Sequence, residues 1–232
     1  MPAKPPERGA AAGASETPPS PRRAVIDRAA GESKRPRRSA EESRRRILAA
    51  AEQRLIEGGV DAVRLQPIAR SLGISDAAIH HHFGSRDGLL AALLRYAGRR
   101  LRDRIEAAAQ AWTAETVDVA ALADLISECY RDRGYARLAL FMKLAGFEES
   151  GSGMLAELAE ALHPIRCARA CARDREPPPL ADTLHWVALF HTLQVADPLL
   201  TESMLRSAGL PDDAVTVRAH RAWVAARLAD ML

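Results

Sequence analysis

The sequence predicts an all-α protein in which a small N-terminal helical domain precedes a larger helical bundle. Ala, Leu and Arg are abundant among the 232 residues and only ten residues are aromatic, which favours helix over strand. Long stretches after Tyr96 contain few Gly or Pro interruptions and repeat apolar residues at helical spacing. The length leaves room for two folded parts. We therefore expect helices only and no strands.

Residues 1–38 are expected to form a disordered basic arm. They are rich in Pro, Ala and Arg and have almost no bulky apolar side chains, so they cannot bury enough surface to offset the entropy of ordering. Nine Lys or Arg against four Asp or Glu make the segment positive. Its cluster at residues 34–38 is either an ordinary solvated run or a contact for nucleic-acid phosphates.

The N-terminal domain is expected over residues 39–94. Its first helix should begin near Ala40, because Ser39 and Glu42 form the capping-box pattern, and should end at Gly58-Gly59. Apolar residues at four-residue spacing, such as Ile47 and Leu55, give this helix one buried face.

Residues 64–94 predict a helix-turn-helix followed by a supporting helix. Ile68 and Leu72 give the first short helix an apolar face, and Gly73 can take the left-handed conformation that closes it. Ser75 stands at the N-cap position of the second short helix, where its hydroxyl can accept a bond from a free backbone N–H.

The second short helix is the candidate for reading DNA. Its apolar Ile79 and Phe83 should turn inward and leave its N-terminal residues on the outer face. In this motif the second helix lies in the major groove with its N-terminal residues at the base edges. Arg86, which follows the expected cap Ser85 of the supporting helix, suits a phosphate contact. The residues expected to contact DNA are Arg64, Gln66, Ser75, Asp76, Ala77, His80, His81 and Arg86.

The pattern I-A, G-I-S, H-H-F and S-R-D-x-L-L within about thirty residues resembles the TetR family of bacterial transcriptional regulators. Members of that family usually carry Thr where this chain has Arg64 and Tyr where it has His80. Phosphate contacts at these two positions would therefore come from different side chains here.

The larger domain is expected over residues 95–232. Apolar periodicity predicts helices near 85–98, 100–114, 118–132, 135–147, 153–174, 180–197 and 211–231. Pro164 should kink or split the helix near 153–174, and Pro198 should end the helix near 180–197.

Residues 184–195 are apolar nearly all round their helix, so this helix must be covered on both sides. A second subunit is the most plausible cover on one side. The last helix offers a matching stripe: Val215, Ala219, Ala222, Trp223 and Ala226. The TetR resemblance implies a homodimer formed through C-terminal helices, and a two-fold dimer requires a palindromic operator in double-stranded DNA.

The resemblance also implies that the middle helices of the larger domain enclose a cavity for a small effector. Apolar residues with a few polar groups could line it, although plain core packing explains each of them singly. These ligand-binding candidates are Trp112, Cys129, Phe141, Met142, Phe147, Trp186, Phe190 and His191.

No motif of an enzyme, cofactor site or metal site was found. Three consecutive histidines from His80 point in different directions on a helix, and His163, Cys167 and Cys171 share a face that Pro164 distorts. Three cysteines are too few for a disulfide framework, and no stretch has the features of a membrane span or a secretory signal. We therefore expect a cytoplasmic protein that is not an enzyme.

The resemblance implies a sequence-specific DNA-binding regulator, a repressor that a small molecule releases from its operator. Two alternatives stay open. One is an activator or global regulator on the same fold, and the other is a ligand-binding helical protein that has lost DNA binding.

Overall fold

The computed structural model describes residues 34–147 and 153–232. Within these ranges the protein is all-α, as predicted, and contains no strand. The chain divides into two units, residues 1–43 and residues 44–232. The described part of the first unit is the start of helix α2, and the second unit contains all the other helices. Most of the arm predicted to be disordered lies outside the described residues.

Helix α2 (Lys34–Ala62) begins before Ser39, so the predicted start was wrong. Pro36 lies in the first turn, where its missing N–H costs little, and it does not prevent an earlier start. The predicted stop is confirmed as a break in the helical conformation: Gly59 has φ 70° and ψ −168°, outside the helical region. The chain resumes a helical course after it and reaches Ala62.

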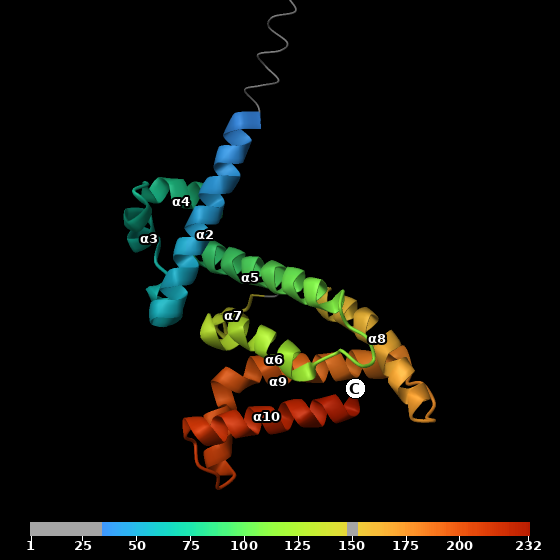
Figure 1. Ribbon diagram of the computed structural model, residues 1–232. Coiled ribbons are helices and arrows are strands. Elements are labelled where there is room, and N and C mark those ends of the chain that lie inside the picture. The colour runs from blue at the N-terminus through green and yellow to red at the C-terminus, as the bar shows by residue number, and fades with distance from the viewer. Residues whose placement is uncertain (1–33, 148–152) are drawn as a thin grey trace, which may run out of the picture. The chain divides into compact units, whose positions relative to one another are not determined.

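Helices α3 (Leu65–Leu72) and α4 (Asp76–Phe83) form the predicted helix-turn-helix and lie beside α2 in Figure 1. Gly73 adopts φ 66° and ψ 32°, the left-handed conformation expected for it. The Ser75 Oγ accepts a bond from the N–H of Ala78 at 3.3 Å and caps α4. The turn therefore forms through the residues that the sequence pattern singled out.

The three helices enclose an apolar core. The large side chains of their facing stripes are almost fully buried; they are Ile47, Leu48, Leu55, Ile68, Ile79 and Phe83. Burial of each such side chain contributes about 1.5–3 kcal/mol relative to exposure, which explains how short helices such as α3 and α4 stay folded.

Helix α5 (Arg86–Ala109) is one continuous helix, whereas the sequence predicted a break near residue 99. Its buried stripe runs without interruption from Leu89 through Leu101 to Ile105. Because this stripe packs along its whole length, Gly98 stays helical and the predicted break does not occur.

The remaining helices follow the predicted order. They are α6 (Val119–Ser127), the π-helical turn η1 (Glu128–Asp132), α7 (Tyr135–Leu144), α8 (Met154–Ala172), α9 (Leu180–Ser207) and α10 (Ala214–Met231). No described helix is long and apolar enough to cross a membrane.

Two prolines lie inside helices. Helix α8 passes through Pro164 without a split, so of the two predicted effects the kink stays a prediction. Helix α9 passes through Pro198, which was wrongly expected to end it. Tertiary contacts on both sides of Pro198 compensate for the hydrogen bond that its missing N–H cannot make. Before it, Arg221 binds the Asp197 carboxylate at 2.9 Å, and after it, the side chain of Leu205 is buried.

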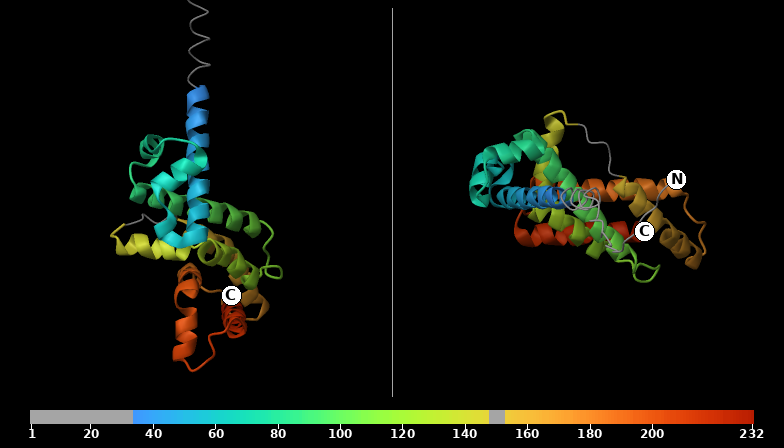
Figure 2. Two further views of the ribbon diagram at one scale, coloured as in Figure 1. Left: turned by 90° about the vertical axis from the view of Figure 1, so that its left-hand side faces the viewer. Right: turned by 90° about the horizontal axis from the view of Figure 1, so that it is seen from above.

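In the second unit α8 packs on α9, and α10 packs on both α6 and α9. Figures 1 and 2 show these helices from three directions. The rings of Trp186 and Phe190 stack at 5.2 Å inside α9's buried face. On its other face Leu184, Leu189 and Leu193 are exposed, so α9 is covered on one side only within this chain.

Candidate functional site

The outer face of α4 is exposed as the sequence predicted. Asp76, Ala77, His80 and His81 are all exposed, while Ile79 is fully buried. Arg64, Gln66 and Ser75 are exposed as well. The helix therefore projects polar and small side chains from the surface, in the manner that a major groove admits.

Arg44 of α2 holds the C-terminal end of α4. Its guanidinium donates to the carbonyl of His82 at 2.9 Å and lies 4.5 Å from the ring centre of Phe83. The last carbonyls of a helix have no partner within it and carry the negative end of its dipole, so a cation there satisfies both needs. Burial, followed by the charges of Arg95 and Arg99, lowers the pKa of Arg44.

Arg86 has a contact that the sequence did not predict. Its Nε donates to the carbonyl of Val63 at 2.8 Å, and one terminal nitrogen donates to the carbonyl of Val60 at 2.7 Å. The guanidinium at the start of α5 thus binds the carbonyls at the C-terminal end of α2. Because these partners lie more than twenty residues away along the chain, local sequence reasoning found only the expected phosphate contact.

His80 and Arg64 also bind main-chain carbonyls close to them in the sequence. The Nδ1 of His80 donates to the Gly84 carbonyl at 2.8 Å, which fixes the ring against the end of α4. The Nε of Arg64 donates to the carbonyl of Asp61 at 3.0 Å. Among the other predicted DNA contacts, the side chains of Gln66, Asp76 and His81 make no hydrogen bond with any described residue, and Ala77 has no polar side-chain atom.

A buried carboxylate joins α2 to α5 and α7. Glu52 is 8% exposed and accepts bonds from the hydroxyl of Tyr135 at 3.0 Å and from Arg100 at 3.0 Å. A terminal nitrogen of Arg133 lies 3.4 Å from it. Burial and the charge of Glu52 raise the pKa of Tyr135, so its hydroxyl keeps the proton that it donates. We call these four residues the Glu52 network.

Sequence reasoning missed the Glu52 network, although one signal pointed to it. Glu52 lies on the apolar stripe of α2, between Leu48 and Leu55, both of which are buried. An acid on such a stripe needs partners from other helices, because burial of an unpaired charge is costly. The sequence could not reveal that these partners come from α5 and α7.

The network extends to η1 through Arg133. That side chain donates to Glu128 at 2.9 Å, and Arg104 of α5 lies 2.7 Å from the other carboxylate oxygen. Hydrogen bonds from Arg133 and Arg104 lower the pKa of Glu128, so it stays charged. The π-helical turn is thereby fixed to α5.

A cavity of about 740 Å³ opens between α5, η1 and the start of α8, and we call it the α5 cavity. Three of the eight ligand-binding candidates line it: Cys129, Phe147 and His191. Tyr135, a member of the Glu52 network, lines it too. A volume of this size lies within the usual range for small-molecule sites, about 300–1,000 Å³.

The other five candidates do not line this cavity. Trp186, Phe190 and Met142 are buried in the core, Trp112 packs partly buried against it, and Phe141 is 36% exposed with its ring centre 5.8 Å from the Arg86 guanidinium. Helical periodicity identifies apolar faces but not which of them leave space. A role of these five positions in effector binding stays a prediction.

Tyr130 and His191 form a polar pair in the cavity wall. The hydroxyl of Tyr130 lies 2.9 Å from Nε2 of His191, and burial lowers the pKa of His191, which favours its neutral form. Its Nδ1 is buried without a hydrogen-bond partner among the described residues. His191 was a candidate, whereas Tyr130 was not.

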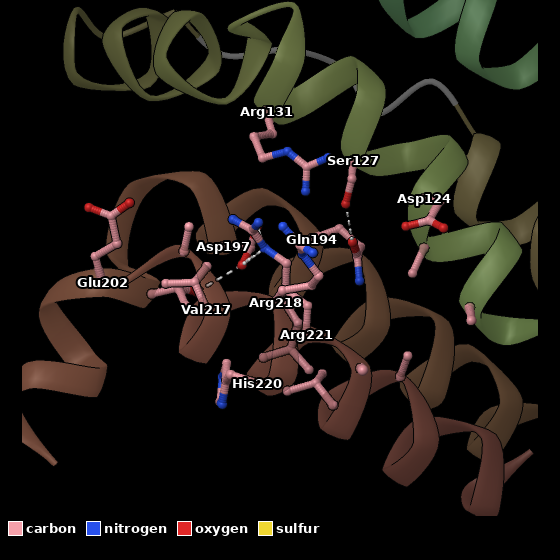
Figure 3. Close-up of a pocket in the computed structure, with 18 residues that line it drawn as sticks. Asp124, Ser127, Arg131, Gln194, Asp197, Glu202, Val217, Arg218, His220 and Arg221 are labelled. Carbon is pink, nitrogen blue, oxygen red and sulfur yellow. Dashed lines mark hydrogen bonds and ion pairs between the residues drawn. The ribbon is translucent and has the colours of Figure 1, made fainter. Parts of the chain in front are cut away.

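A second cavity of about 670 Å³ lies between α6, α9 and α10 (Figure 3). Two pairs of its polar side chains are bonded to each other: Arg221 binds Asp197 at 2.9 Å, and Ser127 donates to Gln194 at 3.1 Å. None of the ligand-binding candidates lines it. Its pairing of charges contrasts with the unpaired His191 nitrogen of the α5 cavity.

The described ranges contain no group of three His, Cys, Asp or Glu side chains arranged to hold a metal ion. His163 and Cys167 lie 3.7 Å apart through Nε2 and Sγ, and Cys171 is exposed. His163 also shares a hydrogen bond of 3.0 Å with Thr183. This bond explains the orientation of the His163 ring, so no metal ion is needed to explain it.

Two solved structures resemble the chain over most of its length. One, a possible TetR family transcriptional regulator from Streptomyces coelicolor A3(2), has 20% identity and a TM-score of 0.46, covering 80% of this chain and 88% of that one. The other, a gamma-butyrolactone receptor described as ArpA-like, has 20% identity and a TM-score of 0.40, covering 84% and 100%.

The sequence of the N-terminal domain gives the more specific similarity. The HTH-type transcriptional regulator BetI of Rhizobium meliloti (strain 1021) is 42% identical over 64 residues, which are 28% of this chain and 32% of BetI. The match thus spans about a third of that relative. Residues 47–93, which contain α3, α4 and the stripe of α2, match the model of the bacterial regulatory proteins of the tetR family. Over residues 47–93 the chain is therefore similar to the bacterial regulatory proteins of the tetR family.

Proposed function

We propose that the protein is a sequence-specific DNA-binding transcriptional regulator, a repressor that leaves a palindromic operator when a small effector binds. The exposed face of α4 is the observation that carries this proposal. Its core side chain Ile79 is buried, its cap is formed, and Asp76, Ala77 and His81 face solvent. Such a helix can enter a major groove without rearrangement.

The residues of α4 suggest separate roles in DNA recognition. Ala77 is small enough to touch the methyl group of a thymine, His81 can donate to a base acceptor, and Asp76 can accept from a cytosine amino group. Arg64, Gln66 and Ser75 lie at the edge of the surface, where phosphates would pass. Because His80 and Arg86 already donate to backbone carbonyls, their proposed role is to fix the surface beside the phosphates.

The proposed assembly is a homodimer formed through α9 and α10. Apolar side chains on these helices are exposed in the single chain; the larger ones are Leu184, Leu189, Leu193, Leu200, Met204, Val215 and Trp223. Trp223 alone is 61% exposed. Large exposed apolar side chains on two helices favour an interaction site there, and a two-fold dimer would place two α4 helices about one DNA turn apart.

The proposed effector site is the α5 cavity. Tyr135 lines this cavity and donates its hydroxyl to Glu52 of α2, the helix against which α3 and α4 pack. A ligand that moves Tyr135 therefore acts on the helix that supports the DNA-binding surface. Effector and operator affinities would be coupled reciprocally through this contact.

Gel retardation with the promoter DNA next to the protein's own gene tests the proposal. The wild type should retain this fragment over a shuffled one across a salt series, and His81→Ala should weaken retention about tenfold, as expected for loss of one base contact of 1–3 kcal/mol. Lys143→Ala, an exposed change on α7, is the control and should not alter retention. Equal retention of both fragments by the wild type would refute a specific regulator.

A further inference from the structure

The wall of the α5 cavity carries a one-sided charge. Arg95, Arg99 and Arg102 follow each other at spacings of four and three on α5, so they share a face of that helix, and all three line the cavity. No Asp or Glu occurs among the cavity's lining residues in the described part of the chain. The charged side chains among the described lining residues are therefore all cationic.

Two of these arginines have no counter-ion in the described ranges. Arg102 pairs with Glu157 through Nε at 3.1 Å, whereas Arg95 and Arg99 make no ion pair or hydrogen bond with any described residue. Their charges act on Arg44, whose pKa burial and these two neighbours lower. A ligand that brings a negative charge to them would relieve a repulsion already present.

The inner wall is apolar. Ala97, Leu101 and Met154 are almost fully buried and line the cavity beside the half-buried Leu155. Burial raises the pKa of the Cys129 thiol to about 11, so this wall residue is neutral at physiological pH. The volume of about 740 Å³ thus has an apolar interior and a cationic border.

One polar group faces the cavity from the side of α9. Nε2 of His191 shares a hydrogen bond with the hydroxyl of Tyr130, and Nδ1 is buried and lacks a partner among the described residues. A buried polar atom of this kind costs about 1–3 kcal/mol when left unsatisfied. A polar atom on a bound molecule would satisfy it.

We propose that the α5 cavity binds an amphipathic organic anion. Its carboxylate or equivalent head group lies against Arg95 and Arg99, and its aliphatic or aromatic body fills the space between Leu101 and Met154. This inference rests on the proposed function in one respect only, namely that the α5 cavity is the effector site.

Two matched pairs of probes test the ligand class on the full chain by isothermal titration calorimetry. They are octanoate with 1-octanol and 4-phenylbutanoate with 4-phenyl-1-butanol, and the members of each pair differ in the charged head group. At least one carboxylate should bind, and at least tenfold more tightly than its alcohol. Absence of binding by both carboxylates, or equal affinity within each pair, would overturn the proposal.

The double variant Arg95→Gln/Arg99→Gln locates the charge. It should remove the preference for the carboxylate and leave the affinity for the alcohol unchanged, and because both side chains are exposed the variant should fold normally, which circular dichroism checks. Arg137→Gln, an exposed arginine of α7 outside the cavity, is the matched control and should keep the preference. An unchanged preference in the double variant would contradict the assignment.

Gel retardation without any probe separates this inference from the proposed function. Specific retention of operator DNA together with no carboxylate preference would refute the ligand class and leave the regulator intact. A carboxylate preference without specific retention would support the ligand class and refute the proposed regulator.

Discussion

Arginine side chains serve one purpose in the helix-turn-helix region and another around the α5 cavity. In the helix-turn-helix region Arg44 and Arg86 donate to main-chain carbonyls at the ends of helices. Around the α5 cavity Arg100 and Arg133 converge instead on the carboxylate of Glu52. The first use fixes the ends of α2 and α4, and the second connects α2 to α5 and to the turn before α7.

The difference has a consequence for regulation. Main-chain carbonyls cannot titrate or leave, so the contacts of Arg44 and Arg86 keep α4 in one orientation. A side-chain carboxylate can exchange partners, and one partner of Glu52, Tyr135, belongs to the cavity wall. We therefore expect the helix-turn-helix region to move as a rigid piece and the Glu52 network to be the adjustable connection.

The largest effect should come from Glu52→Ala. Removal of the carboxylate leaves Tyr135 without its acceptor and two arginines without their counter-charge, at a cost of about 2–3 kcal/mol in the free energy of unfolding, since the arginines are partly exposed. Glu57→Ala on the same helix is the control and should cost under about 0.5 kcal/mol, because its pair with Arg54 is exposed. Urea denaturation measures both, and similar losses would show that Glu52 is no special connection.

A smaller effect should come from Gly73→Val. At φ 66° a β-branched side chain is strained by about 1–2 kcal/mol. The angle between α3 and α4 should change with it, so operator retention should fall further than thermal stability alone implies. Gly73→Asn should recover most of the loss, because Asn tolerates this conformation. Full retention by the valine variant would mean that the turn does not set the orientation of α4.

Arg86→Lys should destabilise the protein by about 1 kcal/mol, because an ammonium group cannot keep both carbonyl bonds of the guanidinium fork. Arg64→Lys is the matched control at an exposed arginine and should be nearly neutral. Octanoate should protect both variants against thermal unfolding as well as it protects the wild type, because Arg86 has a structural role apart from the α5 cavity. Loss of that protection in Arg86→Lys would contradict the separation between the two groups of arginines.

The smallest effect concerns pH and His191. Burial holds its folded-state pKa below the value of 6.5 expected in the unfolded chain, so the unfolded state binds the proton more readily. Its contribution to stability is complete above pH 6.5 and declines as the pH falls below it. Between pH 7.5 and 5.5 His191→Gln should lose less stability than the wild type, by up to about 1 kcal/mol. His185→Gln, exposed on the same helix, should follow the wild type.

The helix-turn-helix was predictable because its signals are local. Gly73 closes α3 and Ser75 caps α4, and each acts on residues within one helical turn. The prolines show the limit of such reasoning. Pro198 was expected to end a helix, but Arg221 and buried Leu205 support the chain on both sides of it. A distant contact thus overrode a local preference.

The sequence by itself determined the helical class, the position of the helix-turn-helix and the exposed face of α4, because periodicity and caps depend on neighbours within four residues. Only the tertiary structure decided which side chains surround the α5 cavity and which groups meet at Glu52. Those contacts join helices that are far apart in the sequence, for instance Glu52 with Tyr135, 83 residues away. Their geometry depends on how whole helices pack against one another, and no local pattern records it.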